Sequence, residues 1–168
     1  MTIDSITVRR VNYQDPTDRA ALCAMLNAYA QDPMGGGEVL AEKNLARLCD
    51  DLASRPFAFS FLAWQSNSSG QEAVGLANCF EGYSTFKAQP LINIHDIAVH
   101  PSARGRGVGQ ALLQAVEAEA KARSACKITL EVLSGNTVAI KSYGRFGFGA
   151  YQLDPTIGQA VFLQKWIA

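Results

Sequence analysis

Apolar residues recur along the chain with two spacings, which predict two kinds of element. Where every second residue is apolar or β-branched, a strand is expected, and where apolar residues lie three or four apart, a helix is expected. The strands are predicted at Ile3–Val11, Phe57–Trp64, Ala73–Glu81, Leu91–Val99, Ile128–Leu133, Gly149–Leu153 and Ala160–Trp166. The helices are predicted from Pro16 to near Asp32, over residues 41–52, at Gly107–Arg123 and at Asn136–Phe146.

Local signals set the ends of these elements. Asp15 stands before Pro16, which is a typical helix start, and Asp18 is then favourable near the positive end of the helix dipole. Proline and three glycines within Asp32–Gly37 end that helix. Asn67–Gly70 is a turn, so the strands on either side are expected to form a hairpin. The order βααβββαβαββ predicts one α/β domain.

Composition and charge narrow the class of protein. The 168 residues are 48% hydrophobic and 18% charged, unlike a disordered chain. Basic and acidic residues number 15 each, whereas proteins that bind nucleic acid normally have a basic excess, so no nucleic-acid partner is expected. The amino terminus lacks the apolar core of a signal peptide, and no run is long enough to cross a bilayer. These features favour a soluble, cytoplasmic protein without a membrane partner.

The four cysteines (Cys23, Cys49, Cys79 and Cys126) lie far apart, with no CxxC pair and no histidine at a metal-ligand spacing. Their apolar neighbours predict small buried side chains in a reducing compartment. We therefore expect no metal site.

A glycine-rich loop follows the fourth predicted strand. Gly105, Gly107 and Gly109 leave backbone N–H groups uncovered at the start of a helix, where the helix dipole is positive. That combination binds phosphate or pyrophosphate. Arg104 and Arg106 add positive charge, unless Arg106 points only to solvent.

Three kinds of phosphate-binding loop compete for this segment. A P-loop needs a Lys-Ser/Thr pair, which is missing, and a dinucleotide-binding loop needs GxGxxG, whereas residues 105–110 read GxGxGx. Arg104-x-x-Gly107-x-Gly109 instead resembles the pyrophosphate loop of the GCN5-related N-acetyltransferase (GNAT) superfamily, Gln/Arg-x-x-Gly-x-Gly/Ala. The segment 136–148 is similar to the next motif of that superfamily, Asn-x-x-Ala-x-x-x-Tyr-x-x-x-Gly-Phe, and lies one strand and one helix further on.

The resemblance implies a single-domain GNAT fold over residues 1–168, with a mixed central sheet flanked by helices and acetyl-CoA as the cosubstrate. In that fold the pantetheine arm lies between two splayed parallel strands, and the diphosphate binds the amides of the glycine loop. Asn136 is expected to bond the pantetheine arm, and Tyr143 to lie near the sulfur. The residues expected to contact the cofactor are Ile97, Ala98, Val99, Arg104, Gly105, Arg106, Gly107, Val108, Gly109, Gln110, Asn136, Tyr143 and Arg145.

The loop Gly82–Pro90 resembles that of the diamine (spermidine/spermine-type) acetyltransferases, which have a similar Tyr-Ser-Thr-aromatic run before a Glu-Asp pair. Here the pair reads His95-Asp96, so the glutamate of that branch is replaced. Because side chains alternate along a strand, we expect His95 and Asp96 on opposite faces of the sheet, unless a bulge re-aims one of them.

Acetyl transfer to an amine needs a base, a donor to the oxyanion and an acid for the leaving thiolate. Histidine titrates near neutral pH, which makes His95 the first candidate for the base; the alternative is a histidine satisfied within the sheet. Tyr143 is the candidate acid, and the alternative is a tyrosine that only packs on the helix face of Ala139 and Phe146. A backbone N–H of the Ile97–Val99 strand is expected to stabilise the oxyanion.

The loop after the first helix is expected to form the wall for the acceptor. Asp32 and Glu38 would select a cationic amine, and Tyr29 and Met34 would line an apolar slot, unless these are only capping and core residues. Asp96 is a further candidate for binding the acceptor. The predicted function is transfer of acetyl from acetyl-CoA to a primary amine of a small molecule. The alternatives are Nα-acetylation of a peptide or protein, acyl-CoA binding without catalysis, and nucleotide binding. A homodimer stays open.

Overall fold

The computed structural model describes residues 5–68, 70–151, 154, 156, 158 and 160–167. The strands of this part are β1 (Ile6–Arg10), β2 (Ala58–Asn67), β3 (Gly70–Ser84), β4 (Gln89–Val99) and β5 (Ile128–Leu130). The helices are α1 (Pro16–Gln31), α2 (Glu42–Ala53), α3 (Val108–Ala122) and α4 (Thr137–Phe146), with a short 3₁₀ turn at Pro101–Ala103. None of the helices within these residues combines the length and the hydrophobicity that crossing a membrane requires.

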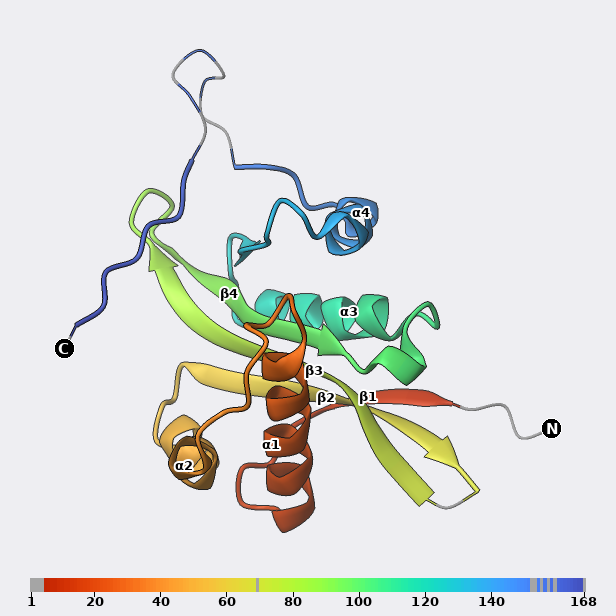
Figure 1. Cartoon of the computed structure of the whole chain (residues 1–168). Coiled ribbons are helices and arrows are strands. Elements are labelled where there is room, and N and C mark those ends of the chain that lie inside the picture. Colours follow the sequence, from red (N-terminus) through yellow and green to blue (C-terminus); the bar gives the residue numbers. More distant parts are fainter. Residues whose placement is uncertain are drawn as a thin grey trace.

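The described strands form one mixed sheet in the order β1-β2-β3-β4-β5 (Figure 1). Neighbours from β1 to β4 are antiparallel, which confirms the predicted hairpin of β2 and β3, while β4 and β5 are parallel. The parallel pairing covers only Ile92–Ile94 against Ile128–Leu130. The fifth strand is therefore shorter than the predicted Ile128–Leu133. As a consequence, β4 continues to Val99 without a β5 partner.

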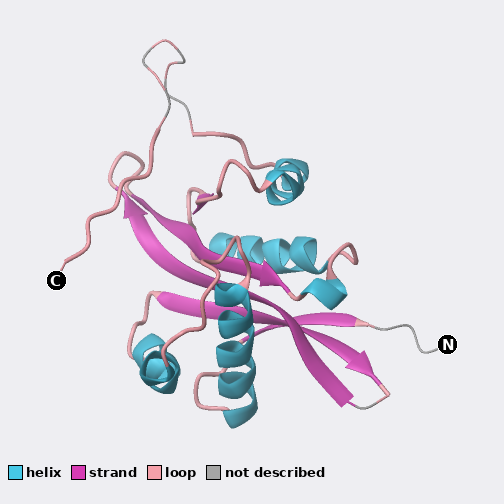
Figure 2. Cartoon of the chain, in the orientation of Figure 1, coloured by secondary structure: helices cyan, strands magenta, loops and turns pink. Residues whose placement is uncertain are grey.

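Helices cover both faces of the sheet (Figure 2). Helices α1 and α2 pack on one face around Leu22, Leu62 and Leu76, each with 0% of its surface exposed. Helix α3 packs on the other face through Val108 and Leu112, and burial of such aliphatic side chains contributes about 1.5–3 kcal/mol each.

A glycine allows α3 to approach the sheet closely. A Cβ atom at Gly75 of β3 would lie 2.9 Å from Val108 Cγ1 and 3.0 Å from Leu112 Cδ1, so a larger residue would push the first turns of α3 outward. Gly75 thus fixes the position of the helix that begins at the glycine-rich loop.

The start of α1 confirms the capping prediction and adds a contact that the sequence did not reveal. The Asp15 side chain accepts hydrogen bonds from the backbone N–H groups of Thr17 (2.9 Å) and Asp18 (3.0 Å). Asp18 itself is fully buried, and its carboxylate accepts two hydrogen bonds from the Arg9 guanidinium, at 2.6 and 2.8 Å. Asp18 therefore joins α1 to β1 rather than only favouring the helix dipole.

The two strands predicted to close the sheet are not observed in the described residues. Ala160–Trp166 is not a strand, and neither are residues 149–151; Gln152 and Leu153 lie outside the described residues. Val161, Leu163 and Trp166 are 76%, 83% and 85% exposed. The apolar alternation that predicted a strand is present, but a strand also needs a neighbour to complete its ladder of hydrogen bonds, and local propensity does not supply one.

Candidate active site

The predicted site lies where β4 extends beyond β5. On one side Ile97–Val99 pair with Gly75–Ala77 of β3, and on the other side no strand of the described part lies opposite them. A cavity of about 220 Å³ opens between this end of β4 and the C-terminal half of α1. Its lining residues are Met25, Ala28, Tyr29, Gln31, Asp32, Ala98, Val99, His100, Pro101 and Arg104. The structure thus brings together several residues that were assigned to the acceptor and to the cofactor.

The glycine-rich loop presents the start of α3 without a side-chain cap. Gly107 is the N-cap residue of α3, with a φ of 83°, and Gly105 has a φ of 77°. A Cβ atom at either glycine would meet nothing within 4 Å, so the left-handed backbone, not crowding, favours glycine there. Val108 is buried and anchors the helix start. The uncovered first-turn N–H groups fit an anionic diphosphate.

Gly107→Asp is expected to weaken acetyl-CoA binding by at least about 10-fold. The substitution forces a left-handed conformation that costs about 1–2 kcal/mol and places a carboxylate against the anion. Isothermal titration with acetyl-CoA measures the effect. Gly70→Asp is the matched control, because Gly70 also has a positive φ (130°) in open space but lies at the β2–β3 turn. Wild-type affinity in Gly107→Asp would place the diphosphate elsewhere.

Two arginine side chains assigned to the cofactor bond other parts of the protein instead. Arg104 donates to Asp32 Oδ2 at 2.7 Å and to the Val99 carbonyl at 3.1 Å, which ties the glycine-rich loop to the loop after α1. Arg106 donates to the side chain of Gln65 (2.9 Å). The backbone of the loop, rather than these side chains, is the feature that suits an anion.

Gln110 of α3 holds helix α4 in place. Its side-chain Nε2 donates to Ser142 Oγ at 2.9 Å and to the Ser142 carbonyl at 3.1 Å. Asn136 caps α4, since its Oδ1 accepts from the Ala139 N–H at 3.2 Å. Arg145 is exposed in the last turn of the same helix. Gln110 and Asn136 therefore fix the helix that bears Tyr143.

A β-bulge re-aims the His95-Asp96 pair. Asn78 lies opposite Asp96 and Cys79 lies opposite Ile94, so His95 is an extra residue without a partner position. The His95 ring packs edge-on against Phe80, with 5.5 Å between ring centroids, and Asp96 accepts from Asn78 Nδ2 at 3.0 Å. Phe80 packs in the cluster under α1 and α2, and Asn78, two residues away, faces the same side. The bulge therefore puts His95 and Asp96 on one face, not on opposite faces.

Two tyrosines from different helices, Tyr29 of α1 and Tyr143 of α4, interact electrostatically with each other, and Tyr29 also with Asp96. Burial raises the pKa of the Tyr29 phenol, and the nearby carboxylates of Asp96 and Asp32 raise it further. Burial also raises the pKa of Tyr143, with a smaller contribution from Tyr29, and the Tyr143 ring packs against Phe148 at 5.9 Å. Both phenols hence stay protonated at neutral pH, as a proton donor must be.

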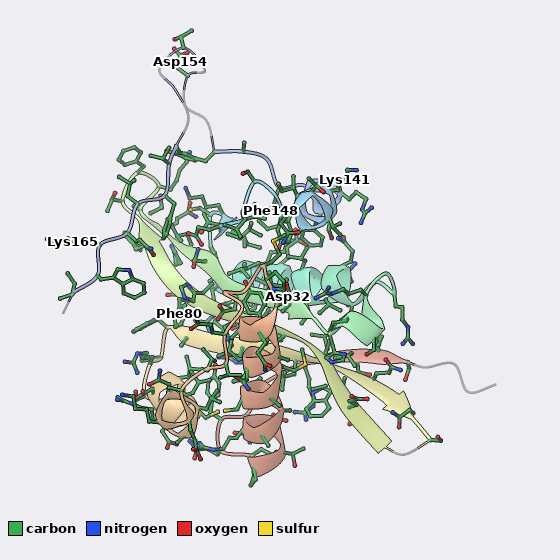
Figure 3. The ribbon with its side chains drawn as sticks, in the orientation of Figure 1. Asp32, Phe80, Lys141, Phe148, Asp154 and Lys165 are labelled. Atoms are coloured by element: carbon green, nitrogen blue, oxygen red, sulfur yellow. The ribbon has the colours of Figure 1, made fainter. Side chains whose placement is uncertain are left out.

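The carboxylate of Asp32 is already paired. Asp32 follows α1 directly (Figure 3), and its pKa is held below the ordinary value first by the Met34 N–H and then by Arg104. Met34 does not line the cavity and is 43% exposed. A Cβ atom at Gly35 would lie only 1.9 Å from the Tyr29 carbonyl, so this glycine lets the loop fold back onto α1. The sequence assigned Gly35 to the end of the helix, but it did not reveal this close approach.

The buried cysteines are poor nucleophiles. Burial raises the pKa of Cys79 to about 12 and that of Cys49 to about 11. The thiolate is the reactive form of cysteine. Neither side chain is therefore suited to carry an acyl group at neutral pH.

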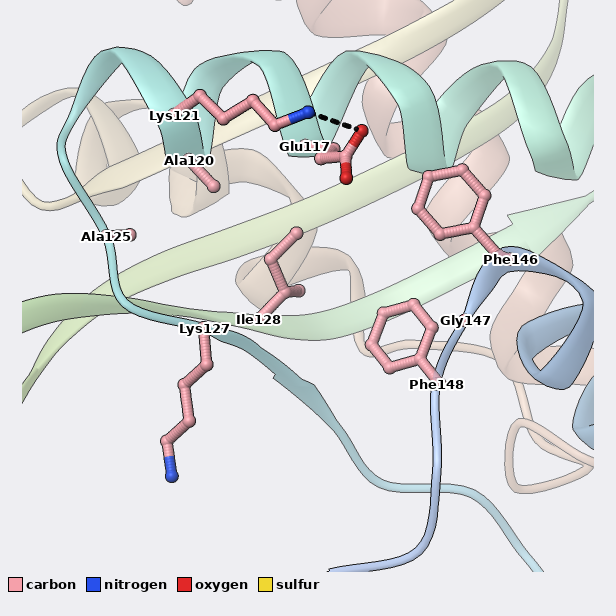
Figure 4. A pocket seen from close by; sticks show the side chains of 9 residues that line it. All are labelled: Glu117, Ala120, Lys121, Ala125, Lys127, Ile128, Phe146, Gly147 and Phe148. Atoms are coloured by element: carbon pink, nitrogen blue, oxygen red, sulfur yellow. Dashed lines mark ion pairs between the residues drawn. The ribbon is translucent and has the colours of Figure 1, made fainter.

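A second cavity, of about 270 Å³, lies on the α3 side (Figure 4). The side chains of Ile128, Phe146 and Phe148 line it, and Lys121 pairs with Glu117 at 3.0 Å beside it. It contains none of the residues that the sequence assigned to catalysis or binding.

Known proteins with similar sequences share one family. The model of the acetyltransferase (GNAT) family matches residues 22–148. The mycothiol acetyltransferase of Tsukamurella paurometabola is 33% identical over 156 residues, which cover 89% of this chain and 50% of that protein. The chain thus spans about half the length of this protein and of the mycothiol acetyltransferase of Mycobacterium leprae.

Solved structures share the fold at low identity. A probable acetyltransferase aligns with a TM-score of 0.79 at 17% identity, over 96% of this chain and 99% of that one. AAC(6')-Iy, in complex with the bisubstrate analogue CoA-S-monomethyl-acetylneamine, aligns with a TM-score of 0.74 at 18% identity, over 97% and 99% of the two chains. The short pairing of β4 with β5 and the start of α3 without a side-chain cap agree with this fold. The family match over residues 22–148 shows that this chain belongs to the acetyltransferase (GNAT) family.

Proposed function

We propose that the chain transfers acetyl from acetyl-CoA to the primary amine of a small cationic acceptor, by direct attack. The observation that supports this most is the cavity at the open end of β4, which Tyr29 lines while it interacts electrostatically with Asp96 and Tyr143. The names of the relatives agree with a small-molecule acceptor, and AAC(6')-Iy was solved with a CoA-containing bisubstrate analogue.

The residues present fit acetyl-CoA. The first-turn amides of α3 would hold its diphosphate, and the unpaired edge of Ile97–Val99 would bond the pantetheine arm. Bound acetyl-CoA supplies a thioester whose carbonyl carbon accepts the amine. A backbone N–H on the same edge of β4 would stabilise the oxyanion.

Asp96 binds the acceptor in this proposal, and His95 and Tyr143 transfer protons. Asp96 holds the acceptor's ammonium, and His95 takes one of its protons, directly or through water. The neutral amine then attacks, the C–N bond forms and the C–S bond breaks. Tyr143 gives its proton to the leaving sulfur, which releases CoA as the thiol, and the nitrogen loses a second proton as the amide forms, which restores the Tyr143 phenol.

The acceptor class follows from the two carboxylates that interact with Tyr29, which are those of Asp96 and Asp32. Because Arg104 already pairs with Asp32 at 2.7 Å, we assign recognition of the ammonium to Asp96. Tyr29 and Met25 of α1 would contact the apolar part of the acceptor. The Gly82–Pro90 loop suggested a diamine, but the similar relatives are mycothiol acetyltransferases, so we propose small cationic amines in general rather than diamines.

A panel of acceptors tests this function. Small cationic amines, neutral amines of similar size and short peptides with a free amino terminus are compared by thiol release from acetyl-CoA. The proposal expects turnover with cationic small molecules and a higher kcat/KM than with peptides. Peptide acetylation alone would favour an Nα-acetyltransferase, and acetyl-CoA binding without any turnover would favour a non-catalytic binding module.

His95→Gln is expected to remove the rising limb of the pH profile of kcat/KM and to lower the rate about 10²-fold or more. Glutamine keeps a polar side chain of similar size but takes up no proton. Two acceptors of different amine pKa separate the enzyme's limb, which stays fixed, from the amine's own ionisation. If the limb persists in His95→Gln, another group removes the proton and His95 only packs against Phe80.

A further inference from the structure

A chain of four hydrogen-bonded polar side chains, of which the middle two are buried, crosses the sheet beneath α1 and ends at Asp96. Tyr13 OH lies 2.7 Å from Ser60 Oγ, Ser60 Oγ donates to Asn78 Oδ1 at 2.6 Å, and Asn78 Nδ2 donates to Asp96 Oδ2 at 3.0 Å. The four residues come from the segment before α1 and from β2, β3 and β4. Ser60 and Asn78 are 1% and 4% exposed.

The hydrogen bonds of this chain run in one direction. The Asn78 carbonyl oxygen can only accept, so the single Ser60 hydroxyl proton points to Asn78. Ser60 Oγ must then accept from Tyr13, whose pKa is raised by burial and whose phenol therefore stays protonated. This order turns the Asn78 amide so that its N–H₂ group faces Asp96.

Asp96 directly follows the bulge, and its carboxylate is held on one side only. Asn78 donates to one carboxylate oxygen, Oδ2. None of the described residues forms a hydrogen bond to the other oxygen, Oδ1. A fixed Oδ2 leaves Oδ1 to accept from a bound cation in a defined direction. Buried polar chains in which each member is satisfied restrict side-chain orientation in this way.

We propose that Asn78, oriented by Ser60 and Tyr13, is a positioning residue that holds Asp96 for the acceptor's ammonium. This inference rests on the proposed function and adds a specificity element to it. Asn78 touches neither the acceptor nor acetyl-CoA; it acts through Asp96. The buried chain thereby links the core under α1 to the choice of acceptor.

The kinetic test uses substitutions of similar size. Asn78→Leu should raise the KM for a cationic acceptor about 10- to 100-fold, which is the range for loss of a hydrogen bond to a charged group, with the KM for acetyl-CoA unchanged. Ser60→Ala should have a smaller effect, because Asn78 keeps its bond to Asp96. Asn93→Leu is the matched control: Asn93 is an asparagine of the neighbouring strand, β4, and bonds Thr129 at 3.2 Å, on the β5 side.

A double-mutant cycle separates positioning from simple damage to the core. If Asn78 acts through Asp96, Asn78→Leu should cause no further loss of acceptor affinity in an Asp96→Ala background. Independent, multiplicative losses, or an equal loss in Asn93→Leu, would overturn the proposal. Thermal unfolding of each variant confirms that the folded protein is being compared.

A second readout needs no acceptor and so distinguishes this inference from the proposed function. If the wild-type enzyme acetylates no amine, the proposed function fails, but the side-chain amide of Asn78 is still visible in ¹⁵N NMR spectra of the whole chain. Its N–H₂ signals should move in Asp96→Ala and stay in place in Asp32→Ala, where a carboxylate outside the polar chain is removed. If the Asn78 signals do not move in Asp96→Ala, Asn78 does not hold the Asp96 carboxylate in solution.

Discussion

Tyr143→Phe is expected to lower kcat by about 10²–10⁴-fold while acetyl-CoA binds as before. Phenylalanine keeps the ring that packs against Phe148 and removes only the hydroxyl. Because burial raises the pKa of Tyr143, the phenol is protonated at the pH of the reaction and can donate to the leaving sulfur. The loss should therefore appear in the chemical step and not in cofactor affinity.

Single-turnover kinetics with acetyl-CoA and the best acceptor measure this effect. Tyr83→Phe is the control, because Tyr83 of β3 is 62% exposed and its hydroxyl has no role in the proposal. An unchanged rate of the chemical step in Tyr143→Phe would leave Tyr143 as a packing residue of α4, the alternative that its helical spacing also allows.

Asp18→Ala is expected to lower the free energy of unfolding by about 1.5–3 kcal/mol, the range for hydrogen bonds to a charged group, since the Arg9 side chain is itself 44% exposed. The Asp18 carboxylate is fully buried and accepts from the Arg9 guanidinium and the Asn12 N–H, at 2.6–2.8 Å. Its removal leaves the Arg9 charge against the Trp64 ring, 4.8 Å away, without its counter-ion. Urea unfolding at neutral pH measures the loss.

The pH dependence of stability has a defined sign. Burial acts to raise the pKa of Asp18, but the hydrogen bonds from Arg9 and from the Asn12 N–H outweigh it, so the net shift is downward. The contribution of the pair is therefore complete above the unfolded carboxyl pKa of about 3.9 and is lost as the pH falls through the lower folded value. Asp50→Ala is the control, because Asp50 pairs with Arg19 but is 68% exposed. Equal losses in the two variants would contradict this account.

Local signals in the sequence were enough where a contact lies within a few residues. Asp15 capped α1 as predicted, and the row of glycines before Val108 identified the start of α3, because capping and positive φ are decided by neighbours in the chain. The family motifs also identified Tyr143, which interacts electrostatically with Tyr29 of the cavity, and its role as the proton donor stays a prediction.

Contacts that depend on strand register were not predictable. The extra residue His95 appears only when Asn78 and Asp96 are paired, and the same register places Ser60 and Asn78 in one chain of hydrogen bonds. Asp18 reads as a favourable first-turn residue, and only packing of α1 on β1 brings it to Arg9. The alternating segment Ala160–Trp166 shows the reverse, a strand pattern for which the described sheet provides no neighbour.

The central claim, direct transfer of acetyl from acetyl-CoA to an amine, is tested most directly by following the acetyl group itself. The enzyme is mixed with ¹³C-acetyl-labelled acetyl-CoA and the best small cationic acceptor, and thiol, acceptor and protein are analysed by mass spectrometry during turnover. The account predicts one labelled amide for each thiol released and an unlabelled protein at every time point. Thiol release without labelled acceptor, or label that accumulates on the protein before it reaches the amine, would contradict it.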